Sequence, residues 1–421
     1  MTRRQRAKIK AAAALAAMVL VLVALLLIIG VVKLIAGPIS PKNTQDDGGK
    51  QMVGLAVQET TKAHIEPVEI SLLATGDNLV HNRVYERAYN EATDTYDFNY
   101  MFEPIRELTE SADIAVINQE TMFVADREQI SNYPAFGTPM EMGDAIINAG
   151  FDVVLGATNH TYDKRNYGVQ SMLDYWSDKE PLLLGLNKTP EDYNKINYVE
   201  SKGVKLAMFN YTYGTNGITV PDDLCYTVNT LEDEDKLLED IQTAEKEADM
   251  TICFLHIGTE YQYTPSAYQV EVIEHCIDSG ADLIICAHPH VVEPYGKVTT
   301  DAGNSAVVYY SCGNLLSAQD RPERLLGGLA DVKIVKDDDG TRVSEYNFIP
   351  VVTWFTDDKE RVYLLDDYTD TLAAQHKHAA CYPEMAQASY FRNLWNKIVG
   401  EPGQEQEMCD CGVRIAKSNG A

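Results

Sequence analysis

The sequence predicts an α/β domain with a largely buried sheet, preceded by an N-terminal transmembrane helix. Three observations support this prediction. Short apolar runs alternate with helical patterns between about residues 68 and 355, polar residues able to bind metals follow one predicted strand after another, and an uncharged apolar stretch lies near the N-terminus. With 421 residues, 45% of them hydrophobic, the chain can bury a sizeable core.

The N-terminal segment, residues 1–36, has the composition of a membrane anchor. Five basic residues lie within the first ten positions, and Ala11 to Val32 contains no charged residue. As a helix this stretch would be about 33 Å long, close to the thickness of one bilayer core. The basic flank predicts a single-pass protein of the cell membrane with an extracytoplasmic C-terminal domain. The alternative, a cleaved signal peptide, has a shorter apolar region and a small-x-small cleavage site, which Leu34-Ile35-Ala36 matches poorly.

The charge balance excludes some classes of partner. The formal net charge is −28, and the first 42 residues hold seven Lys/Arg and no Asp/Glu, so the remainder has 28 Lys/Arg against 63 Asp/Glu, a balance of −35. Such a surface does not suit nucleic acid, whose binding depends on neutralising phosphates. It also disfavours lying flat on an anionic membrane. An anionic substrate would need a metal ion or a local basic patch to be held.

After a predicted stalk at residues 37–67, rich in Pro, Gly and scattered charges, the predicted domain occupies residues 68–355. Its predicted strands are Ile70–Ala74, Ile114–Ile117, Val153–Leu155, Leu182–Leu184, Val204–Phe209, Thr251–Leu255, Leu283–Cys286 and Val307–Tyr310. Its predicted helices are Met101–Glu110, Met142–Asn148, Glu232–Glu247 and Tyr268–Asp278, with Gly280 ending the last.

The C-terminal part begins with a predicted hairpin. Gly328–Val335 and Ser344–Val352 flank an acidic turn at residues 337–340. Residues 356–421 are predicted as a helical extension, with a helix at Tyr382–Val399, and a loose tail. Of the eight cysteines, those at 253, 276 and 286 lie in apolar stretches and are predicted to be buried free thiols. Cys409 and Cys411, in the tail, either pair with each other or with Cys381, or bind a metal.

The chemistry is predicted at the carboxyl ends of the strands, where open α/β sheets bind their ligands. Imidazole, carboxylate and amide oxygen groups together suit one or two divalent ions such as Mn, Fe or Zn. Two such ions would favour hydrolysis or group transfer at a phosphoryl or acyl centre. Alone, each residue has a structural explanation as a turn residue, a solvated acid or a structural histidine. The residues that follow the strands are Asp77, Asn118, Glu120, Asn159, His160, Asp163, His256, His288 and His290.

Six stretches resemble one known family in their order and content. They are Ala74–His81, Ala112–Glu120, Gly150–Val154 with Thr158–Asp163, His256–Tyr261, Gly280–His290 and Tyr310–Asn314. Through them the chain resembles the CapA-type poly-γ-glutamate capsule biosynthesis family, a branch of the calcineurin-like metallophosphoesterase superfamily. The resemblance covers about Val68 to Trp354. It implies a metallophosphoesterase-like α/β sandwich with a metal site at its edge, and work on a γ-linked glutamate polymer or a related anionic envelope polymer.

The resemblance also implies roles for single residues. Asp77 matches the first metal-binding aspartate, and Glu120 stands where phosphoesterases usually carry a bridging aspartate. Asn159 matches a metal ligand, and His160 matches the histidine that stabilises the leaving group or the transition state. The remaining implied ligands are His256, His288 and His290.

One departure from the family pattern concerns a metal ligand. The phosphoesterase pattern Asp-x-His is Asp77-Asn78-Leu79 in this chain, so one ligand is missing. His81 is the candidate substitute; otherwise one metal site is weak or empty. The departure leaves full dinuclear phosphatase activity in doubt.

Further candidates surround the predicted ligands. Catalysis is assigned to His160, Asp163 and Glu260, where Glu260 is either a general acid or base or a solvated loop acid. Substrate binding is assigned to Asn118, Lys164, Arg165 and Asn314, and basic loop residues are more commonly just solvated.

Three functions remain open from the sequence. The first is a metal-dependent hydrolase or transferase that acts in the synthesis, export, anchoring or trimming of the polymer or its precursor. The second is a non-catalytic accessory subunit of a membrane-bound polymer synthase, which the predicted anchor and the missing histidine favour. The third is a general extracytoplasmic phosphoesterase.

Overall fold

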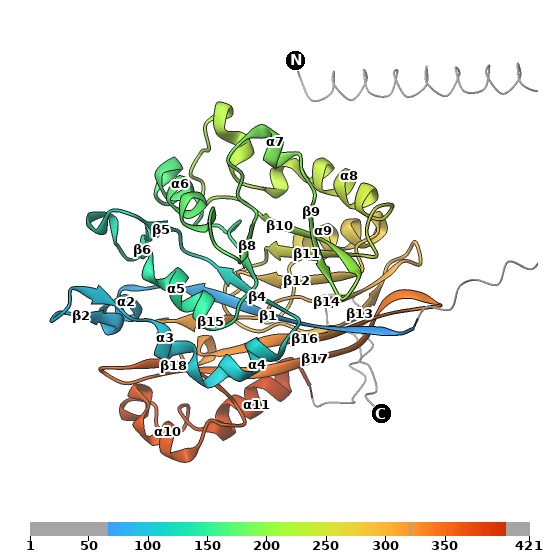
Figure 1. Ribbon diagram of the computed structural model, residues 1–421. Helices are drawn as coiled ribbons and strands as arrows, with labels where there is room; N and C mark the ends of the chain where they lie inside the picture. Colours follow the sequence, from blue (N-terminus) through green and yellow to red (C-terminus); the bar gives the residue numbers. More distant parts are fainter. Residues whose placement is uncertain (1–65, 320, 401–421) are drawn as a thin grey trace, which may run out of the picture. The chain divides into compact units, whose positions relative to one another are not determined.

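The computed structural model describes residues 66–319 and 321–400, all within one compact unit, Ala63–Ala421 (Figure 1). Two mixed β-sheets pack face to face, and helices cover their outer faces. This arrangement confirms the predicted mixed α/β class. The predicted membrane helix at residues 11–32, nearly all of the predicted stalk and the pair Cys409 and Cys411 lie outside the described residues. Within residues 66–319 and 321–400, no helix combines the length and the apolar character needed to cross a membrane.

The first sheet has eight strands in the order β18-β17-β16-β1-β4-β7-β8, and β15 also pairs with β1. β1 runs parallel to β4 and β15, and β4, β7 and β8 continue in parallel, whereas β16, β17 and β18 are antiparallel. The β16–β17 pair confirms the predicted hairpin. The strands are β1 (Val68–Leu79), β4 (Ile114–Gln119), β7 (Val153–Leu155), β8 (Leu182–Leu184), β15 (Asn314–Ser317), β16 (Leu326–Asp337), β17 (Gly340–Phe355) and β18 (Glu360–Leu364).

The second sheet has six strands in the order β13-β14-β12-β11-β10-β9. Its four inner strands are parallel, and its two edge strands are antiparallel to their neighbours. The strands are β9 (Asn197–Ser201), β10 (Val204–Thr212), β11 (Met250–His256), β12 (Leu283–Ala287), β13 (Tyr295–Thr299) and β14 (Ser305–Tyr309). Two short ribbons lie apart from the main sheets: β2 (Tyr89–Asn90) with β3 (Thr95–Tyr96), and β5 (Phe123–Val124) with β6 (Thr138–Pro139).

The helices differ from the sequence prediction in several places. Those at Asn82–Ala88, Pro190–Tyr193 and Asp370–Gln375 were not predicted, and the predicted helix Tyr382–Val399 begins only at Ala388. The predicted helix Met101–Glu110 is broken at a 3-10 turn, Glu103–Ile105, where proline in the first turn lacks the N–H that a continuous helix needs. The helix α6 was not predicted, because its buried face includes a glycine and a serine, which weakens its apolar periodicity. The helices are α2 (Asn82–Ala88), α3 (Asn99–Phe102), α4 (Arg106–Ser111), α5 (Glu141–Asn148), α6 (Arg165–Trp176), α7 (Pro190–Tyr193), α8 (Glu234–Ala244), α9 (Ala267–Ser279), α10 (Asp370–Gln375) and α11 (Ala388–Ile398).

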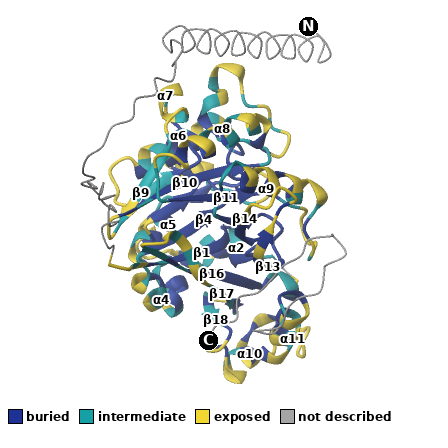
Figure 2. Cartoon of the chain, turned by 90° about the vertical axis from the view of Figure 1, so that its right-hand side faces the viewer, coloured by how far each residue is buried: buried dark blue, intermediate teal, exposed yellow. Residues whose placement is uncertain are grey.

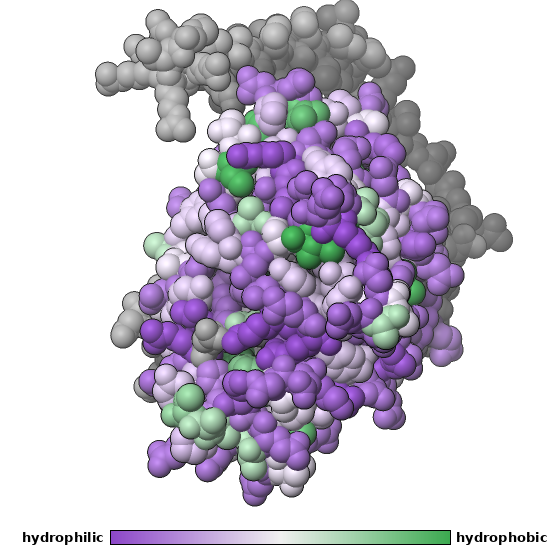
Figure 3. Space-filling view, turned by 90° about the vertical axis from the view of Figure 1, so that its left-hand side faces the viewer, coloured by the Kyte–Doolittle hydropathy of each residue, from purple (hydrophilic) through white to green (hydrophobic). Residues whose placement is uncertain are grey.

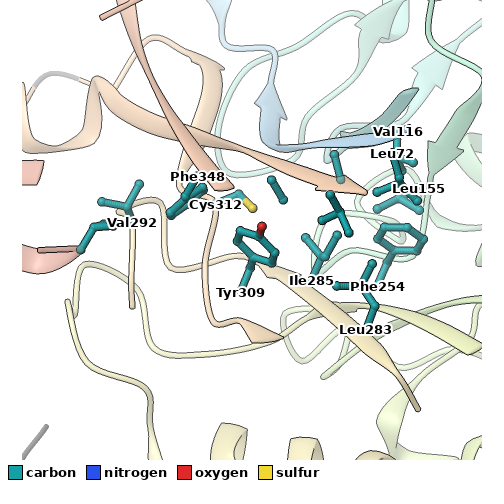
Figure 4. Packing of buried hydrophobic residues seen from close by; sticks show 14 of the residues in the cluster. Leu72, Val116, Leu155, Phe254, Leu283, Ile285, Val292, Tyr309, Cys312 and Phe348 are labelled. Atoms are coloured by element: carbon teal, nitrogen blue, oxygen red, sulfur yellow. The ribbon is translucent and has the colours of Figure 1, made fainter. Parts of the chain in front are cut away.

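The main core lies between the two sheets. Leu72, Val116 and Leu155 of the first sheet meet Phe254 and Ile285 of the second, and all five are buried (Figure 4). Alternate residues of the same strands point outward and pack against helices, α5 and α6 over the first sheet and α8 and α9 over the second. Because both faces of each sheet are covered, the inner strands are buried along most of their length (Figure 2).

The segment after Phe355 contributes to the same core. The strand β18 extends the first sheet, and Phe391 and Trp395 of α11 are buried. The Trp395 ring lies 4.8 Å from the ring of Phe348 on β17. The three cysteines of the apolar stretches, at 253, 276 and 286, are buried and free, as predicted.

A close approach between two glycines holds β1 beside β15. The Asp77 N–H donates to the Gly313 carbonyl oxygen at 2.8 Å, and a Cβ atom added to Gly76 would lie 1.9 Å from that oxygen. We therefore expect Gly76→Ala to force the two strands apart and to destabilise the fold by about 3 kcal/mol, the upper part of the range for overpacking. The measurement is the denaturation midpoint of the full-length chain in mild detergent.

The matched control is Gly214→Ala, because nothing lies within 4 Å of a Cβ atom at that position and its φ is not in the left-handed region. Equal denaturation midpoints for Gly76→Ala and Gly214→Ala would show that the close approach of Gly76 to Gly313 does not contribute to stability.

Candidate metal centre

Two groups of three metal-ligating side chains lie at one place in the fold. Asp77, Glu120 and His290 form one group, and Glu120, His256 and His288 form the other. Within each group, one nitrogen or oxygen atom per residue lies within 4.8 Å of the others, and all five residues are buried. Glu120 belongs to both groups. The structure therefore brings together five of the six side chains predicted as ligands around a shared carboxylate.

Parallel strand pairing explains this convergence. Asp77 lies near the end of β1 and is in register with Asn118 of β4, two residues before Glu120. His256 ends β11 and is in register with Ala287, the residue before His288 on the next strand. Parallel strands present their carboxyl ends at the same edge, so the first sheet supplies the carboxylates and the second the histidines.

The two histidines after β12 are held in an unusual backbone conformation. His288 has a φ of 106° and His290 a φ of 58°, in the left-handed region that residues with a Cβ rarely adopt. The His288 N–H donates to Asp77 Oδ2 at 3.2 Å, and His290 Nδ1 lies 3.2 Å from the same oxygen. Backbone strain of this kind is found where the surroundings hold a functional group in place.

Buried amides position the candidate ligands. Asn118 Nδ2 donates to Asp77 Oδ1 at 2.7 Å and lies 3.3 Å from His256 Nδ1. Asn314 Oδ1 lies 3.1 Å from His290 Nδ1. Both asparagines were predicted to bind substrate, but they are 1% and 0% exposed. This prediction is corrected, because their amides contact the ligand side chains from within the protein.

Asn159, the sixth predicted ligand, joins the cluster through an amide oxygen. Its Oδ1 lies 3.0 Å from His256 Nε2. Its Nδ2 donates to Asn216 Oδ1 at 3.3 Å, and Asn216 Oδ1 also accepts from the Tyr213 hydroxyl at 3.2 Å. The Tyr213 ring lies 4.7 Å from that of His288. The sequence analysis missed Asn216 and Tyr213, although both follow the predicted strand Val204–Phe209 and the same strand-end argument would have found them.

The electrostatics of the cluster favour a bound cation. Burial, and then the negative charge of Asp77, raise the pKa of Glu120 well above its usual range. Burial opposes charge on His290, but the carboxylates of Glu120 and Asp77 outweigh it and raise the pKa to about 9. Burial and neighbouring imidazoles lower the pKa of His256, and lower that of His288 to about 3.

Buried polar atoms that lack a hydrogen-bond partner among the described residues indicate whether a metal ion fits this cluster. Both carboxylate oxygens of Glu120, and Nδ1 of His288, are buried and make no hydrogen bond with any residue that the structure describes. Buried polar atoms normally have a partner, and these three belong to the residues grouped above. Carboxylate oxygens with imidazole nitrogens are a donor set that suits Mn, Fe or Zn. The residues therefore fit a divalent metal, whose identity they leave open.

A second pair of groups lies beside the cluster. His160 Nδ1 lies 2.8 Å from Asp163 Oδ2, which also accepts from the Phe136 N–H at 2.8 Å. The His160 ring packs edge-on against that of Phe136, with the ring centres 4.8 Å apart. The carboxylate and the aromatic ring together fix the orientation of this imidazole.

A groove of about 570 Å³ opens over the cluster and is lined in part by His160, Glu260 and His290. The face of the molecule at the left of Figure 1 is mainly hydrophilic, with small scattered hydrophobic groups (Figure 3). Glu260 is exposed and belongs to neither ligand group. His81, the candidate substitute ligand, also lines the groove without joining either group, and its ring packs 5.2 Å from that of Phe136.

The predicted substrate-binding residues Lys164 and Arg165 lie elsewhere. They line a separate hollow of about 480 Å³ together with Asp163 and Tyr167. Arg165 has a φ of 54° and begins α6, and neither Lys164 nor Arg165 lines the groove over the cluster. The structure therefore does not place these two basic side chains over the metal-ligand cluster.

Comparison with known proteins identifies the family. The sequence model of the family "Bacterial capsule synthesis protein PGA_cap" matches residues 71–319, more than half of the chain. The chain belongs to this family. The capsule biosynthesis protein CapA of Bacillus anthracis is 23% identical over 266 residues, 61% of this chain and 62% of that protein. The PGA biosynthesis protein CapA of Bacillus subtilis (strain 168) is 30% identical over 187 residues, 43% of this chain and 47% of that protein.

The chain thus matches less than two thirds of the length of either of these family relatives. Among solved structures, a phosphatase from Mycoplasma pneumoniae has a TM-score of 0.42 at 15% identity, over 68% of this chain and 95% of that chain. The calcineurin-like phosphoesterase YfkN of Bacillus subtilis has a TM-score of 0.39 at 16% identity, over 78% and 99%. Similarities at this level carry no argument about function.

The two ligand groups predict the metal content of the protein. We expect the purified full-length chain to hold about one or two equivalents of Mn, Fe or Zn, and the double variant His288→Ala/His290→Ala to lose most of it, because each group then lacks one of its three donors. Elemental analysis measures this directly. The control is His275→Ala, which removes an exposed histidine of α9. Metal-free wild-type protein, even after reconstitution, would contradict the prediction.

Proposed function

We propose that the protein is a membrane-anchored, extracytoplasmic, metal-dependent hydrolase or transferase that acts on poly-γ-glutamate or a related anionic envelope polymer. The observation that carries the proposal is the pair of buried ligand groups that share Glu120 beneath an open groove. Membership in the capsule synthesis family supports the polymer as the substrate class. The uncharged stretch at residues 11–32, beside a basic flank, supports the anchor and the outward orientation of the domain.

The metal would be held by Asp77, Glu120, His256, His288 and His290, with Asn159 as a sixth candidate ligand. A divalent metal bound there supplies Lewis acidity at a carbonyl or phosphoryl oxygen of the substrate. The buried amides of Asn118 and Asn314 keep the donors oriented. Burial of the cluster keeps bulk water away and strengthens every charge interaction within it.

The dyad of His160 and Asp163 supplies the proton chemistry. Asp163 Oδ2 is placed to accept a hydrogen bond from a protonated His160 Nδ1, which leaves Nε2 as the ring nitrogen that holds or releases a proton. His160 lines the groove next to His290 and therefore lies where a bound substrate would sit. A positioned imidazole of this kind accelerates the breaking of a bond to a poor leaving group by about 10²- to 10⁴-fold.

One observation favours a second function, that of a non-catalytic accessory subunit of a polymer synthase. Leu79 stands where the phosphoesterase pattern has a histidine, and it lines the groove without a donor atom. In that case the domain and its metal-ligand residues would serve the assembly of the synthase. Single substitutions of these residues that leave the fold intact would then leave polymer production unchanged.

Substitution of His160 separates the two functions. We expect the His160→Ala protein to keep the metal content and the denaturation midpoint of the wild type. Because the group that holds the proton is lost, we expect the enzyme's effect on the amount or length of the polymer to fall by about 100-fold or more. The measurement is the amount and length distribution of polymer in polymer-producing cells whose own copy is replaced by each variant. His275→Ala, on the surface of α9, is the control.

Normal polymer in cells that express folded, metal-containing His160→Ala protein would overturn the catalytic proposal in favour of the accessory role. Chelator-sensitive cleavage of a simple phosphodiester by the purified protein, with no effect on polymer, would instead support a general phosphoesterase.

A further inference from the structure

The groove over the metal-ligand cluster gathers positive charge in a strongly acidic protein. Arg83, Arg321 and Arg324 line it, and among its described lining residues Glu260 is the one carboxylate. The chain as a whole has the opposite balance, with 63 Asp/Glu against 35 Lys/Arg. A local excess of cations in a concave surface focuses the field and attracts anions there, while the rest of the surface repels them.

The arginines come from segments that follow two paired strands. Arg83 lies on α2, just after β1, and its guanidinium donates to the Ala318 carbonyl oxygen. Arg321 and Arg324 lie just after β15, which is paired with β1. Among residues 66–319 and 321–400, neither Arg321 nor Arg324 has a carboxylate partner in an ion pair. Two guanidinium groups are therefore available to an anion in the groove.

The guanidinium of Arg324 is held in a fixed orientation. Its central carbon lies 3.5 Å from the centre of the Tyr261 ring, which stacks against it. Stacking on an aromatic ring leaves the N–H groups at the edge of the guanidinium plane free to bind a ligand.

The backbone of Arg324 is linked to a metal-ligand residue. Its carbonyl oxygen accepts from Asn314 Nδ2 at 2.9 Å, and Asn314 Oδ1 lies 3.1 Å from His290 Nδ1. The buried side-chain amide of Asn314 thus links the backbone of Arg324 to the imidazole of His290. The Tyr261 ring, on which the Arg324 guanidinium stacks, lies 5.9 Å from the ring of His290, so an anion held by Arg324 would lie near the candidate metal centre.

The chemistry of the arginines indicates the ligand. A guanidinium binds a carboxylate through two parallel N–H···O bonds, with directionality that a lysine lacks. Two available guanidinium groups at a groove of about 570 Å³ suit a ligand that carries several anionic groups along its length. A γ-linked glutamate chain is such a ligand, because its linkage leaves one free α-carboxylate on each residue.

We propose that Arg321 and Arg324 form a subsite that binds the carboxylates of a polyanionic chain and presents the chain backbone to the metal-ligand cluster. The inference rests on the proposed function, because it assigns the part of the groove that recognises the polymer. It replaces Lys164 and Arg165, which line a separate hollow, as the basic residues that hold the substrate.

Equilibrium binding of a short γ-linked glutamate oligomer tests the subsite. The full-length chain as purified is compared with Arg321→Gln/Arg324→Gln, and we expect binding to weaken by about 10- to 100-fold, because two charge-assisted contacts are lost. The control is Arg342→Gln/Arg392→Gln, which removes the same charge from exposed ion pairs outside the groove and should leave the affinity within about twofold of wild type. Metal content and denaturation midpoint show that each variant is folded.

Two results would overturn the subsite. The first is equal affinity of the groove variant and the wild type. The second is equal weakening in groove and control variants, which would indicate only the effect of net charge. Tighter binding of inorganic phosphate than of the oligomer, lost in the groove variant, would overturn the carboxylate assignment. Because binding requires no turnover, the outcome is independent of whether His160→Ala changes polymer production.

Discussion

The structure depends on placing two carboxylates, Asp77 and Glu120, side by side where water does not reach them. Both are fully buried, and the charge of Asp77 raises the pKa of Glu120. Burying like charges together is strongly unfavourable unless a cation compensates for them. Among the residues that the structure describes, no lysine or arginine pairs with either carboxylate, and the basic side chains within reach are the imidazoles of His256 and His290. Burial and the neighbouring imidazoles lower the pKa of His256, so His290 is the imidazole of this pair that carries charge. A divalent ion bound among these residues would resolve this conflict.

The two sheets supply complementary halves of that centre. β1 and β4 carry the carboxylates, and β11 and β12 end at the histidines. The apolar core between the sheets fixes the distance between the halves, since Leu72 and Phe254 pack within the same cluster. Parallel pairing in both sheets brings all these strand ends to one edge. The geometry of the candidate site is therefore a consequence of how the core packs.

Buried asparagine side chains link the candidate ligands to one another and to the groove lining. Asn118 connects Asp77 with His256, and Asn314 connects His290 with the backbone of Arg324. An amide can donate and accept at once, so a buried asparagine can satisfy a carboxylate and an imidazole without adding charge to an already acidic centre. Through Asn314 this network extends from the candidate ligands to the groove lining, which would couple the proposed chemistry to the proposed substrate subsite.

Much of the fold and of the ligand set could be predicted because the necessary signals are local. Each buried strand is a short apolar run, and each candidate ligand follows such a run by a few residues, as His256 follows Thr251–Leu255. The weaker predictions failed where a local signal was diluted or absent. α6 buries Gly168 and Ser171 on its inner face, and β18 is a short edge strand with little apolar pattern.

The class of fold, the residues at the strand ends and the family that they resemble all follow from the amino-acid sequence alone. Which polar side chains face the groove and which lie beneath it depends on how distant segments pack together. Asn118 and Asn314 turned out to be buried, Lys164 and Arg165 line another hollow, and Arg321 lines the groove. The physical reason is that a strand end specifies where a residue lies along one segment, whereas its neighbours in space come from segments far away in the chain.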